Sequence, residues 1–421
     1  MTVTIKELTN HSYIDHELSA TLDSSNAFEG PEKLLEIWFY PDPTNIPTSK
    51  TLRSIPVAQW VDILKLVKCE ILSMKSTANL DAFLLSESSL FVYDHKLTLK
   101  TCGTTTTLFC LTKLFELVEE ELGWSLKASG ENNNNNNNNN GRYFPYKVFY
   151  SRREFMFPLK QKSIHKNWND EVEYLNQFFC HGKSYMVGRI DQRSHWNLYV
   201  TDTNVSLETR TVGGRRNSSS RCEETYNDET LEILMTKLDP LCAEQFVCNR
   251  TIKENHDPDE SCNEEADDEG HLLGYNMTKK TGLDNVYHDG IKSKGLSFYH
   301  DAFAFSPCGY SSNMIIDEEY YYTLHVTPEK GWSYASFESN VPVHDVSSGK
   351  QDNVDVLLKV LEVFKPREFC LTFFTRNTLN SRSLLHLSSI MKQLGTYRKV
   401  DKIIYDLEDY QLLYMRFDMK E

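Results

Sequence analysis

A short hydroxyl-rich segment between two apolar runs is the part of this sequence best suited to covalent chemistry. Residues 84–92 read LLSESSLFV, and Cys102 follows Ser88 by fourteen residues. A serine hydroxyl can attack the carbonyl that precedes it when the backbone is strained and the oxyanion is stabilised. The same letters also describe a half-buried strand that carries small polar residues. The segment alone therefore leaves two interpretations, a peptide rearrangement at Glu87–Ser88 or an ordinary strand.

The elements around this segment are expected to be mixed strands and helices. Apolar residues recur at helical spacing, and shorter runs have the composition of strands. Helices are predicted at 58–67, from Gly103-Thr104-Thr105 onward with threonine caps, and at 354–363, and strands at 82–92, 96–102 and 369–375. Neither GxGxxG nor GxxxxGK[ST] occurs, which argues against a nucleotide-binding βαβ fold. The pattern predicts layered α+β architecture.

Composition limits the classes of partner and compartment. The chain has 421 residues, of which 40% are hydrophobic, so it can bury a substantial core. A net charge of −15 disfavours nucleic acids and anionic membranes as partners. The polar start has no signal-peptide pattern, no stretch is long enough to span a membrane, and the ten cysteines form no CxxC pair. We predict a cytoplasmic protein with reduced thiols and no metal site.

The composition of several segments predicts that they are insertions in a compact domain or an extension of it. Residues 1–26 are polar and irregular, and we predict a flexible extension followed by one domain over 27–421. Nine consecutive asparagines occupy 132–140, and nine acids against one lysine occupy 253–270. Such compositions cannot bury a core. Disordered inserts are therefore expected near 130–141, 213–224 and 250–295.

Five separated segments resemble the eukaryotic-type S-adenosylmethionine decarboxylases, which are pyruvoyl-dependent and made as self-cleaving proenzymes. The segments are AFEGPEKLLEIWF (27–39), LSESSLFV with KTCGTT, DETLEILMTKLDP (228–240), FSPCGYSSN (305–313), and LHVTPE (324–329) with SYASFESN (333–340). The resemblance covers about residues 27–415, apart from the inserts and a divergent stretch after Thr375. It implies an α+β fold, a four-layer α/β/β/α sandwich of two antiparallel sheets flanked by helices. It also implies a site at the sheet edges near Ser88.

The resemblance implies how the chain is processed. Cleavage between Glu87 and Ser88 gives a β chain, 1–87, and an α chain, 88–421, and Ser88 becomes the covalent pyruvoyl cofactor. By the same resemblance His325 is the base for processing and Ser311 assists it. Histidine suits this task because its pKa lies near working pH. A lone histidine in a strand is otherwise more often structural.

The resemblance also implies how turnover proceeds. The substrate amine forms a Schiff base with the pyruvoyl carbonyl, which serves as an electron sink, and Cys102 protonates the α-carbon. Glu29 and Glu32 match the two essential acids of the family, although EGPEK spacing also fits a solvated helix start. Cysteine is otherwise a small buried residue. That reading is kept for Cys69, Cys110, Cys180 and Cys370, and Cys308 is left unassigned.

Substrate binding is implied by four further matches. Phe28 and Phe305 correspond to the phenylalanines that sandwich the adenine of S-adenosylmethionine, which is the implied substrate. Their rings also favour the sulfonium cation. Glu329 corresponds to the carboxylate that accepts the ribose hydroxyls, and Glu87, as a new chain end, is expected to face the substrate.

A second pocket is implied for putrescine, as an activator. Asp228, Thr230 and Glu232 alternate along one expected strand and so share a face. The complete set of matches is Glu36, Phe149, Asp228, Thr230, Glu232, Glu338, Phe374 and Tyr410. Acids crowded in a dry pocket are unfavourable unless they are paired, and a diamine would pair them. The alternative interpretation is a set of exposed strand acids.

The implied product is decarboxylated S-adenosylmethionine, which supplies aminopropyl groups for spermidine and spermine. One rival interpretation is an inactive homologue that regulates an active partner. It predicts the loss of Ser88, Cys102 or His325, and all three are present. Another rival is a different amino-acid substrate, against which Phe28 and Phe305 argue. The cleaved β and α chains are expected to stay together, and a dimer of the cleaved unit is weakly favoured.

Overall fold

The computed structural model describes most of the chain. The described residues are 30–128, 141–155, 157–189, 195–208, 228–248, 269–287, 294–376, 382–390 and 394–420, with the backbone of Tyr13–Ile14. The predicted insert at 213–224 and nearly all of that at 130–141 lie outside them, as do Phe28 and Glu29. In the part of the chain described here, no helix is long and apolar enough to cross a membrane.

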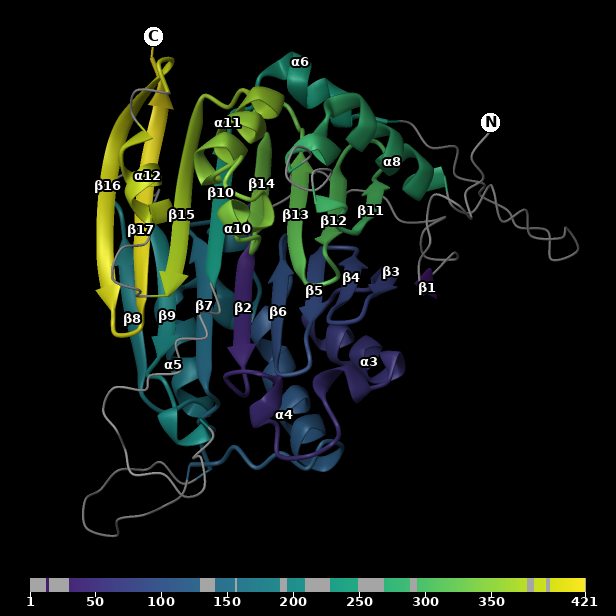
Figure 1. The fold of residues 1–421 in the computed structure, drawn as a ribbon, viewed down its shortest axis with the longest axis vertical. Coiled ribbons are helices and arrows are strands. Elements are labelled where there is room, and N and C mark those ends of the chain that lie inside the picture. The colour runs from purple at the N-terminus through teal and green to yellow at the C-terminus, as the bar shows by residue number, and fades with distance from the viewer. Residues whose placement is uncertain are drawn as a thin grey trace, which may run out of the picture.

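Two antiparallel sheets form the centre of the molecule (Figure 1). The first sheet has the order β1-β3-β4-β5-β6-β2-β7-β9-β8. Its strands are β1 (Tyr13–Ile14), β2 (Lys33–Trp38), β3 (Ile71–Ser76), β4 (Asp81–Leu85), β5 (Ser88–Val92), β6 (Lys96–Thr101), β7 (Lys147–Arg153), β8 (Gly182–Val187) and β9 (Trp196–Thr201). The second sheet has the order β11-β12-β13-β14-β10-β15-β17-β16. Its strands are β10 (Glu229–Thr236), β11 (Phe298–Ala304), β12 (Tyr310–Ile316), β13 (Tyr320–Thr327), β14 (Tyr334–Ser339), β15 (Glu368–Arg376), β16 (Tyr397–Leu407) and β17 (Tyr410–Met419).

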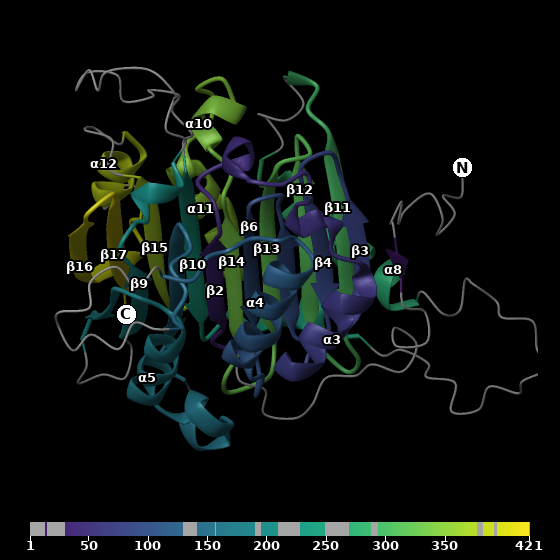
Figure 2. The same cartoon turned by 90° about the horizontal axis from the view of Figure 1, so that it is seen from below.

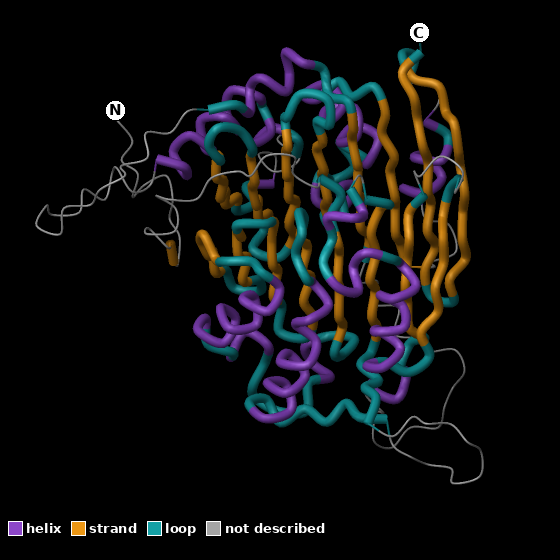
Figure 3. The backbone as a smooth tube through the Cα atoms, turned by 180° about the vertical axis from the view of Figure 1, so that it is seen from behind, coloured by secondary structure: helices purple, strands orange, loops and turns teal. Residues whose placement is uncertain are grey.

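Helices pack on the outer face of each sheet (Figures 2 and 3). The first sheet is covered by α3 (Val57–Val67), α4 (Cys110–Glu120) and α5 (Trp168–Phe178). The second is covered by α6 (Pro240–Ala243), α8 (Glu269–Thr281), α10 (Val343–Val346), α11 (Asn353–Phe364) and α12 (Arg382–Ser388). Two short 3₁₀ helices, η3 (Thr107–Phe109) and η5 (Ser163–Lys166), lie on the helix side of the first sheet.

Strand alternation explains the four layers. Leu35 and Ile37 of β2 pack with the helices of the first sheet. In β10, Ile233 packs toward the helices and Leu234 belongs to a cluster between the two sheets. Because successive strand residues face opposite sides, each sheet buries one apolar face under helices and another against its partner. The predicted α/β/β/α sandwich is confirmed.

Local predictions of helices and strands were right for most elements and wrong for two. The strand predicted at 82–92 is a hairpin, in which β4 and β5 are joined at Ser86 and Glu87 and Leu85 pairs with Ser88. The helix predicted from Gly103 begins instead at Cys110, after η3. The threonines around Gly103 bond to one another and to backbone carbonyls instead of capping the helix. The helices predicted at 58–67 and 354–363 are present, with small differences at their ends.

The structure describes helical or strand residues within one predicted insert and within the predicted flexible extension. Helix α8 lies inside the insert expected at 250–295 and packs on β11. The helix approaches β11 closely at Gly274, where a Cβ would lie 2.7 Å from the backbone carbonyl carbon of Ala302, so only glycine permits this contact. Within the extension predicted at 1–26, Tyr13–Ile14 pairs with β3.

Candidate active site

Ser88 lies at the start of β5, in a strained backbone conformation. Its φ is 127°, and its side chain is fully buried between the two sheets. Consecutive strand residues normally face opposite sides, yet Ser88 and Ser89 both approach the ring of His325. The unusual φ accounts for this arrangement. A non-glycine residue held in this region costs about 1–3 kcal/mol, and such strained residues cluster at active sites.

The carbonyl group of Glu87 already accepts two hydrogen bonds. The backbone N–H of Cys102 donates to it at 3.0 Å, and the Cys102 thiol donates to it at 3.4 Å. This is the carbonyl that the Ser88 hydroxyl would attack, so the two donors point at the position where an oxyanion would form. Burial, with the nearby Glu87 carboxylate, raises the pKa of the Cys102 thiol well above its usual value. Cys102 is therefore protonated and able to donate.

His325 is placed to accept a proton from Ser88. Its Nε2 is 3.0 Å from the Ser88 Oγ, and its Nδ1 is 2.9 Å from the Ser311 Oγ. Burial, with the Lys100 charge as a smaller cause, lowers the pKa of His325 well below its usual value. The imidazole is therefore neutral. With its proton on Nδ1, it donates to Ser311 and leaves Nε2 as an acceptor.

Two other hydroxyls approach the same ring nitrogen. The Ser89 Oγ lies 3.3 Å and the Thr323 Oγ1 3.0 Å from the Nε2 of His325. Ser89 donates to the Asn313 side-chain oxygen at 2.7 Å, and Thr323 donates to a backbone carbonyl of β12 at 2.9 Å. Each hydroxyl has one proton, so theirs are used elsewhere. Among the three, Ser88 is the hydroxyl whose proton Nε2 can accept.

A buried lysine lies among the predicted acids next to this site. The Lys100 Nζ is 2.7 Å from Glu338 and 3.4 Å from both Glu32 and Glu232. Burial raises the pKa of Glu32 to about 7, although Lys100 lowers it. Burial alone would lower the pKa of Lys100, but the three carboxylates raise it above its usual value. The lysine is charged, and these acids are not the exposed strand acids of the alternative interpretation.

Glu32 connects this cluster to the strand that carries His325. Its carboxylate accepts a hydrogen bond from the Ser336 hydroxyl at 2.8 Å. Ser336 on β14 pairs directly with His325 on β13. Glu32 is also 5% exposed, which excludes a solvated helix start for this residue. Its position supports the predicted role near the site.

The remaining predicted pocket residues meet farther along the space between the sheets. The Tyr410 hydroxyl donates to Asp228 at 2.6 Å. The Phe149 ring lies 5.2 Å from the rings of both Phe374 and Tyr410. Thr230 on β10 pairs with Phe374 on β15. Several of the residues predicted for the second pocket thus come together from β7, β15, β17 and the start of β10.

Glu36 lies between the lysine cluster and the aromatic end of the pocket. It pairs across the sheet with Phe149, and the Trp38 indole N–H donates to its carboxylate. Burial raises the pKa of Glu36 to about 7, with Lys96 opposing this shift and Asp228 adding to it. An added cation near Glu36 and Asp228 would therefore be stabilised by both carboxyl groups.

The predicted substrate residues are placed less completely. Phe305 is buried, with its ring 5.0 Å from that of Phe303, and it packs with Leu84 of β4, the neighbour of β5. Glu329 lies beyond the end of β13 and accepts a hydrogen bond from the Trp332 indole at 3.0 Å. The site itself lies between the faces of the two sheets, since β5 is an inner strand, and not at the sheet edges as predicted.

Comparison with known proteins identifies the family of the chain. Residues 25–418 match the family model described as adenosylmethionine decarboxylase. The chain belongs to this family. It is 61% identical to the S-adenosylmethionine decarboxylase proenzyme of Saccharomyces cerevisiae over the full length of both chains. It is 33% identical to that of Xenopus laevis, covering 94% of this chain and 96% of the relative. A solved AdoMetDC monomer from Trypanosoma brucei covers 79% of this chain and 99% of its own, at 19% identity and a TM-score of 0.49.

Sequence reasoning missed the residues that neutralise or orient the site of this decarboxylase. The main one is Lys100, which lies in KLTLKT between core leucines and threonine. A charged residue at an alternating position of a buried strand was a usable signal. The donor role of the Cys102 backbone and the orienting role of Ser336 had no comparable signal. Both depend on contacts between distant segments.

Proposed function

We propose that this chain is a proenzyme that cleaves itself between Glu87 and Ser88 and then decarboxylates S-adenosylmethionine with a pyruvoyl group derived from Ser88. One observation carries the proposal. The Ser88 hydroxyl approaches a neutral imidazole nitrogen at 3.0 Å, while the neighbouring Glu87 carbonyl accepts two hydrogen bonds from Cys102. These are the base and the oxyanion donors that serinolysis needs.

The cleavage uses groups of the chain and one water molecule. The Ser88 oxygen adds to the Glu87 carbonyl carbon, and the C–N bond breaks. The hydroxyl proton passes through His325 to the Ser88 nitrogen, so an ester replaces the amide. His325 then removes the Ser88 α-proton, and the Glu87 carboxylate leaves. Water hydrolyses the imine form of the resulting dehydroalanine, which gives the pyruvoyl group and ammonia.

The residues around Ser88 fit a pyruvoyl group at this position. Such a group supplies an electron sink for decarboxylation. Cys102 is protonated and lies beside residue 88, which suits it to return a proton to the substrate α-carbon. Phe305 supplies an aromatic ring for the adenine, and Glu329 supplies a carboxylate for the ribose hydroxyls. Phe28 and Glu29 complete the proposed site.

Putrescine is the proposed activator of the second pocket. Since Lys100 already pairs with Glu32, Glu232 and Glu338, a diamine is expected at the opposite end. That end offers Asp228 and Glu36 for the ammonium groups. The Phe149, Phe374 and Tyr410 rings there would cover the methylene chain. The proposed product supplies aminopropyl groups for spermidine and spermine. The proposed enzyme is cytoplasmic and forms a dimer of cleaved units.

Intact mass spectrometry of the purified protein tests the proposal. We expect a chain that ends at Glu87 and a second chain that begins with a pyruvoyl-blocked residue 88. Ser88→Ala should remain a single chain, whereas the control Ser89→Ala should still be cleaved. A wild-type chain that stays uncleaved after incubation with putrescine would contradict the proposal and favour the inactive homologue.

A further inference from the structure

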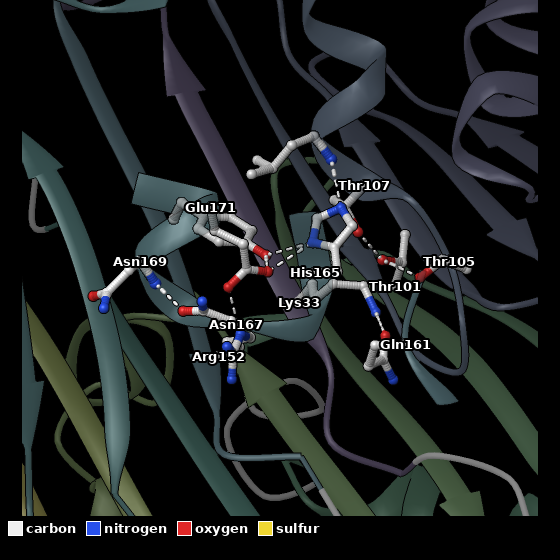
Figure 4. Close-up of polar contacts among 12 residues, drawn as sticks. Lys33, Thr101, Thr105, Thr107, Arg152, Gln161, His165, Asn167, Asn169 and Glu171 are labelled. Atoms are coloured by element: carbon white, nitrogen blue, oxygen red, sulfur yellow. Dashed lines mark hydrogen bonds and ion pairs between the residues drawn. The ribbon is translucent and has the colours of Figure 1, made fainter. Parts of the chain in front are cut away.

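The turn that carries Cys102 is held from the helix side of the first sheet. The Lys33 ammonium donates to the Gly103 carbonyl at 3.2 Å, and the Gln161 amide donates to the same oxygen at 3.1 Å. Lys33 also donates to the Gln161 side-chain oxygen at 3.4 Å. Both side chains lie in the cluster shown in Figure 4, and Lys33 is 0% exposed. A fully buried lysine is rare unless its charge has partners.

Strand register places Lys33 close to the cleavage bond. Lys33 on β2 pairs with Thr101 on β6, and Thr101 pairs with Ser88 on β5. With neighbouring strands about 4.8 Å apart, the backbones of Lys33 and Ser88 are separated by roughly 10 Å. The ammonium reaches from this row to Gly103, the residue after Cys102. Cys102 in turn donates its backbone N–H to the Glu87 carbonyl.

A second buried cluster fixes the layer that contains Gln161. The His165 Nδ1 and the Glu171 carboxylate are 2.6 Å apart, and the Arg152 Nε donates to Glu171 at 2.7 Å. The backbone N–H of Leu108 approaches the other nitrogen of His165 at 3.5 Å. These contacts attach η5 and α5 to the segment that follows the Cys102 turn (Figure 4). Gln161, two residues before η5, therefore contacts Gly103 from beside this cluster.

The charge of Lys33 acts on both groups at the cleavage site. Burial raises the pKa of the Glu87 carboxyl to about 7, and Lys33 opposes this shift. Burial and the Glu87 carboxylate raise the pKa of the Cys102 thiol, with Glu32 and Cys69 adding to the effect, and Lys33 lowers it. Cleavage would add a second carboxylate at Glu87. Partly buried carboxylates are costly without a nearby positive charge.

We propose that Lys33 is a positioning residue of this decarboxylase. Its ammonium holds the Gly103 carbonyl, and with it the Cys102 turn, against Glu87, and its charge stabilises the carboxylate that cleavage creates there. This inference rests on the proposed self-cleavage, because the new carboxylate exists only after it. Lys33 reaches the turn from the helix side of the sheet, whereas Ser88 and His325 meet between the sheets.

Three variants of the full chain test this role. Lys33→Met removes the charge and the hydrogen bond, Lys33→Arg keeps a charge, and Gln161→Leu removes one donor to Gly103 without changing any charge. Appearance of the 88–421 chain is followed by mass spectrometry, and kcat, KM and their pH dependence are measured on the cleaved enzyme. A misplaced catalytic group costs up to about 100-fold in rate. We expect Lys33→Met to lower the cleavage rate and kcat by about 10- to 100-fold. KM should change by no more than about twofold in either direction.

The pH dependence separates a charge effect from loosened packing. Because a cation stabilises the thiolate, its loss should raise the thiol pKa and move the basic limb of the kcat profile to higher pH. Lys33→Arg should return the basic limb of the kcat profile to its wild-type pH, and Gln161→Leu should not shift this limb. If Lys33→Met does not accumulate as folded protein, Lys33→Gln provides the same comparison with a neutral donor.

Each outcome has a distinct meaning. Wild-type cleavage, kcat and basic limb in Lys33→Met would overturn the inference while leaving the proposed function intact. An equal shift of the limb in Gln161→Leu would overturn it too, since that change removes no charge. A wild-type chain that is never cleaved would instead refute the proposed function, and this is seen before any variant is made.

Discussion

Replacing Lys100 by methionine should cost more stability at alkaline than at acidic pH. In the intact protein one ammonium lies within 3.4 Å of Glu32, Glu232 and Glu338, and the Lys100 side chain is fully buried. Methionine keeps most of the volume and removes the charge. Removing one member of a buried ionic cluster typically costs about 3–5 kcal/mol, because the remaining charges lose their partner. We expect a loss of this size at about pH 8.

The sign of the pH dependence follows from Glu32. Its pKa is about 7 in the folded protein and 4.5 for an unperturbed carboxyl. Between these values the folded protein keeps a proton that the unfolded chain releases, so stability falls as the pH rises through this window. Without Lys100 the pKa of Glu32 should rise further, and the window should extend above 7. The deficit of the variant should therefore be smaller at about pH 5, where Glu32 is protonated.

Urea unfolding at the two pH values measures this difference. Both proteins would carry Ser88→Ala, so that the chain stays in one piece. Lys65→Met is the matched control, because Lys65 is 3.5 Å from Asp62 but 66% exposed, and exposed pairs contribute about 0–1 kcal/mol. A Lys100→Met deficit equal at both pH values, or no larger than that of the control, would refute the reasoning.

Four further substitutions test separate parts of the site. His325→Gln should slow cleavage by about 100-fold or more and Ser311→Ala by about tenfold, as followed by mass spectrometry. Equal cleavage rates in the two variants would argue against a base at residue 325. Gly30→Ala should destabilise by about 1–3 kcal/mol in thermal melts, because its Cβ would lie 2.5 Å from the Tyr334 Cγ, and an unchanged melt would show that the segment can move. Tyr410→Phe removes the donor to Asp228 and should raise the putrescine concentration for half-maximal stimulation by about tenfold, and an unchanged dose response would place putrescine elsewhere.

Periodicity predicted the outer layers because those residues pack against their own neighbours. The helix expected at 58–67 is α3, and the strand expected at 369–375 is β15, with differences only at the ends. Cys69, Cys110, Cys180 and Cys370 are buried as predicted. Helix α8 was missed because its partner is the backbone of β11, which approaches Gly274 closely. An acidic segment beside it gave the whole stretch the composition of a disordered insert.

The site could be predicted as a set of residues but not as a geometry. Ser88, Cys102, His325 and Ser311 were found from motifs, and the structure brings all four together. The turn at Glu87 was not found, because residues 82–92 were predicted to form one strand with small polar residues in its middle. That turn is fixed by Ser86, whose N–H donates to the Glu70 carbonyl, and by Cys102. Both contacts join segments that the local pattern cannot relate.

The order of strands explains how strain can be held at Ser88 and how the site would survive cleavage. Strand β2 lies between β6 and β7, and β4 pairs with β5. A break after Glu87 would therefore leave two pieces joined by the hydrogen bonds of three strand pairs, so the piece that carries Glu32, Lys33 and Glu36 would stay in the sheet. The same pairing fixes the backbone on both sides of Ser88. Its unusual φ cannot relax by moving either strand, and breaking the Glu87–Ser88 bond is the local change that would release it.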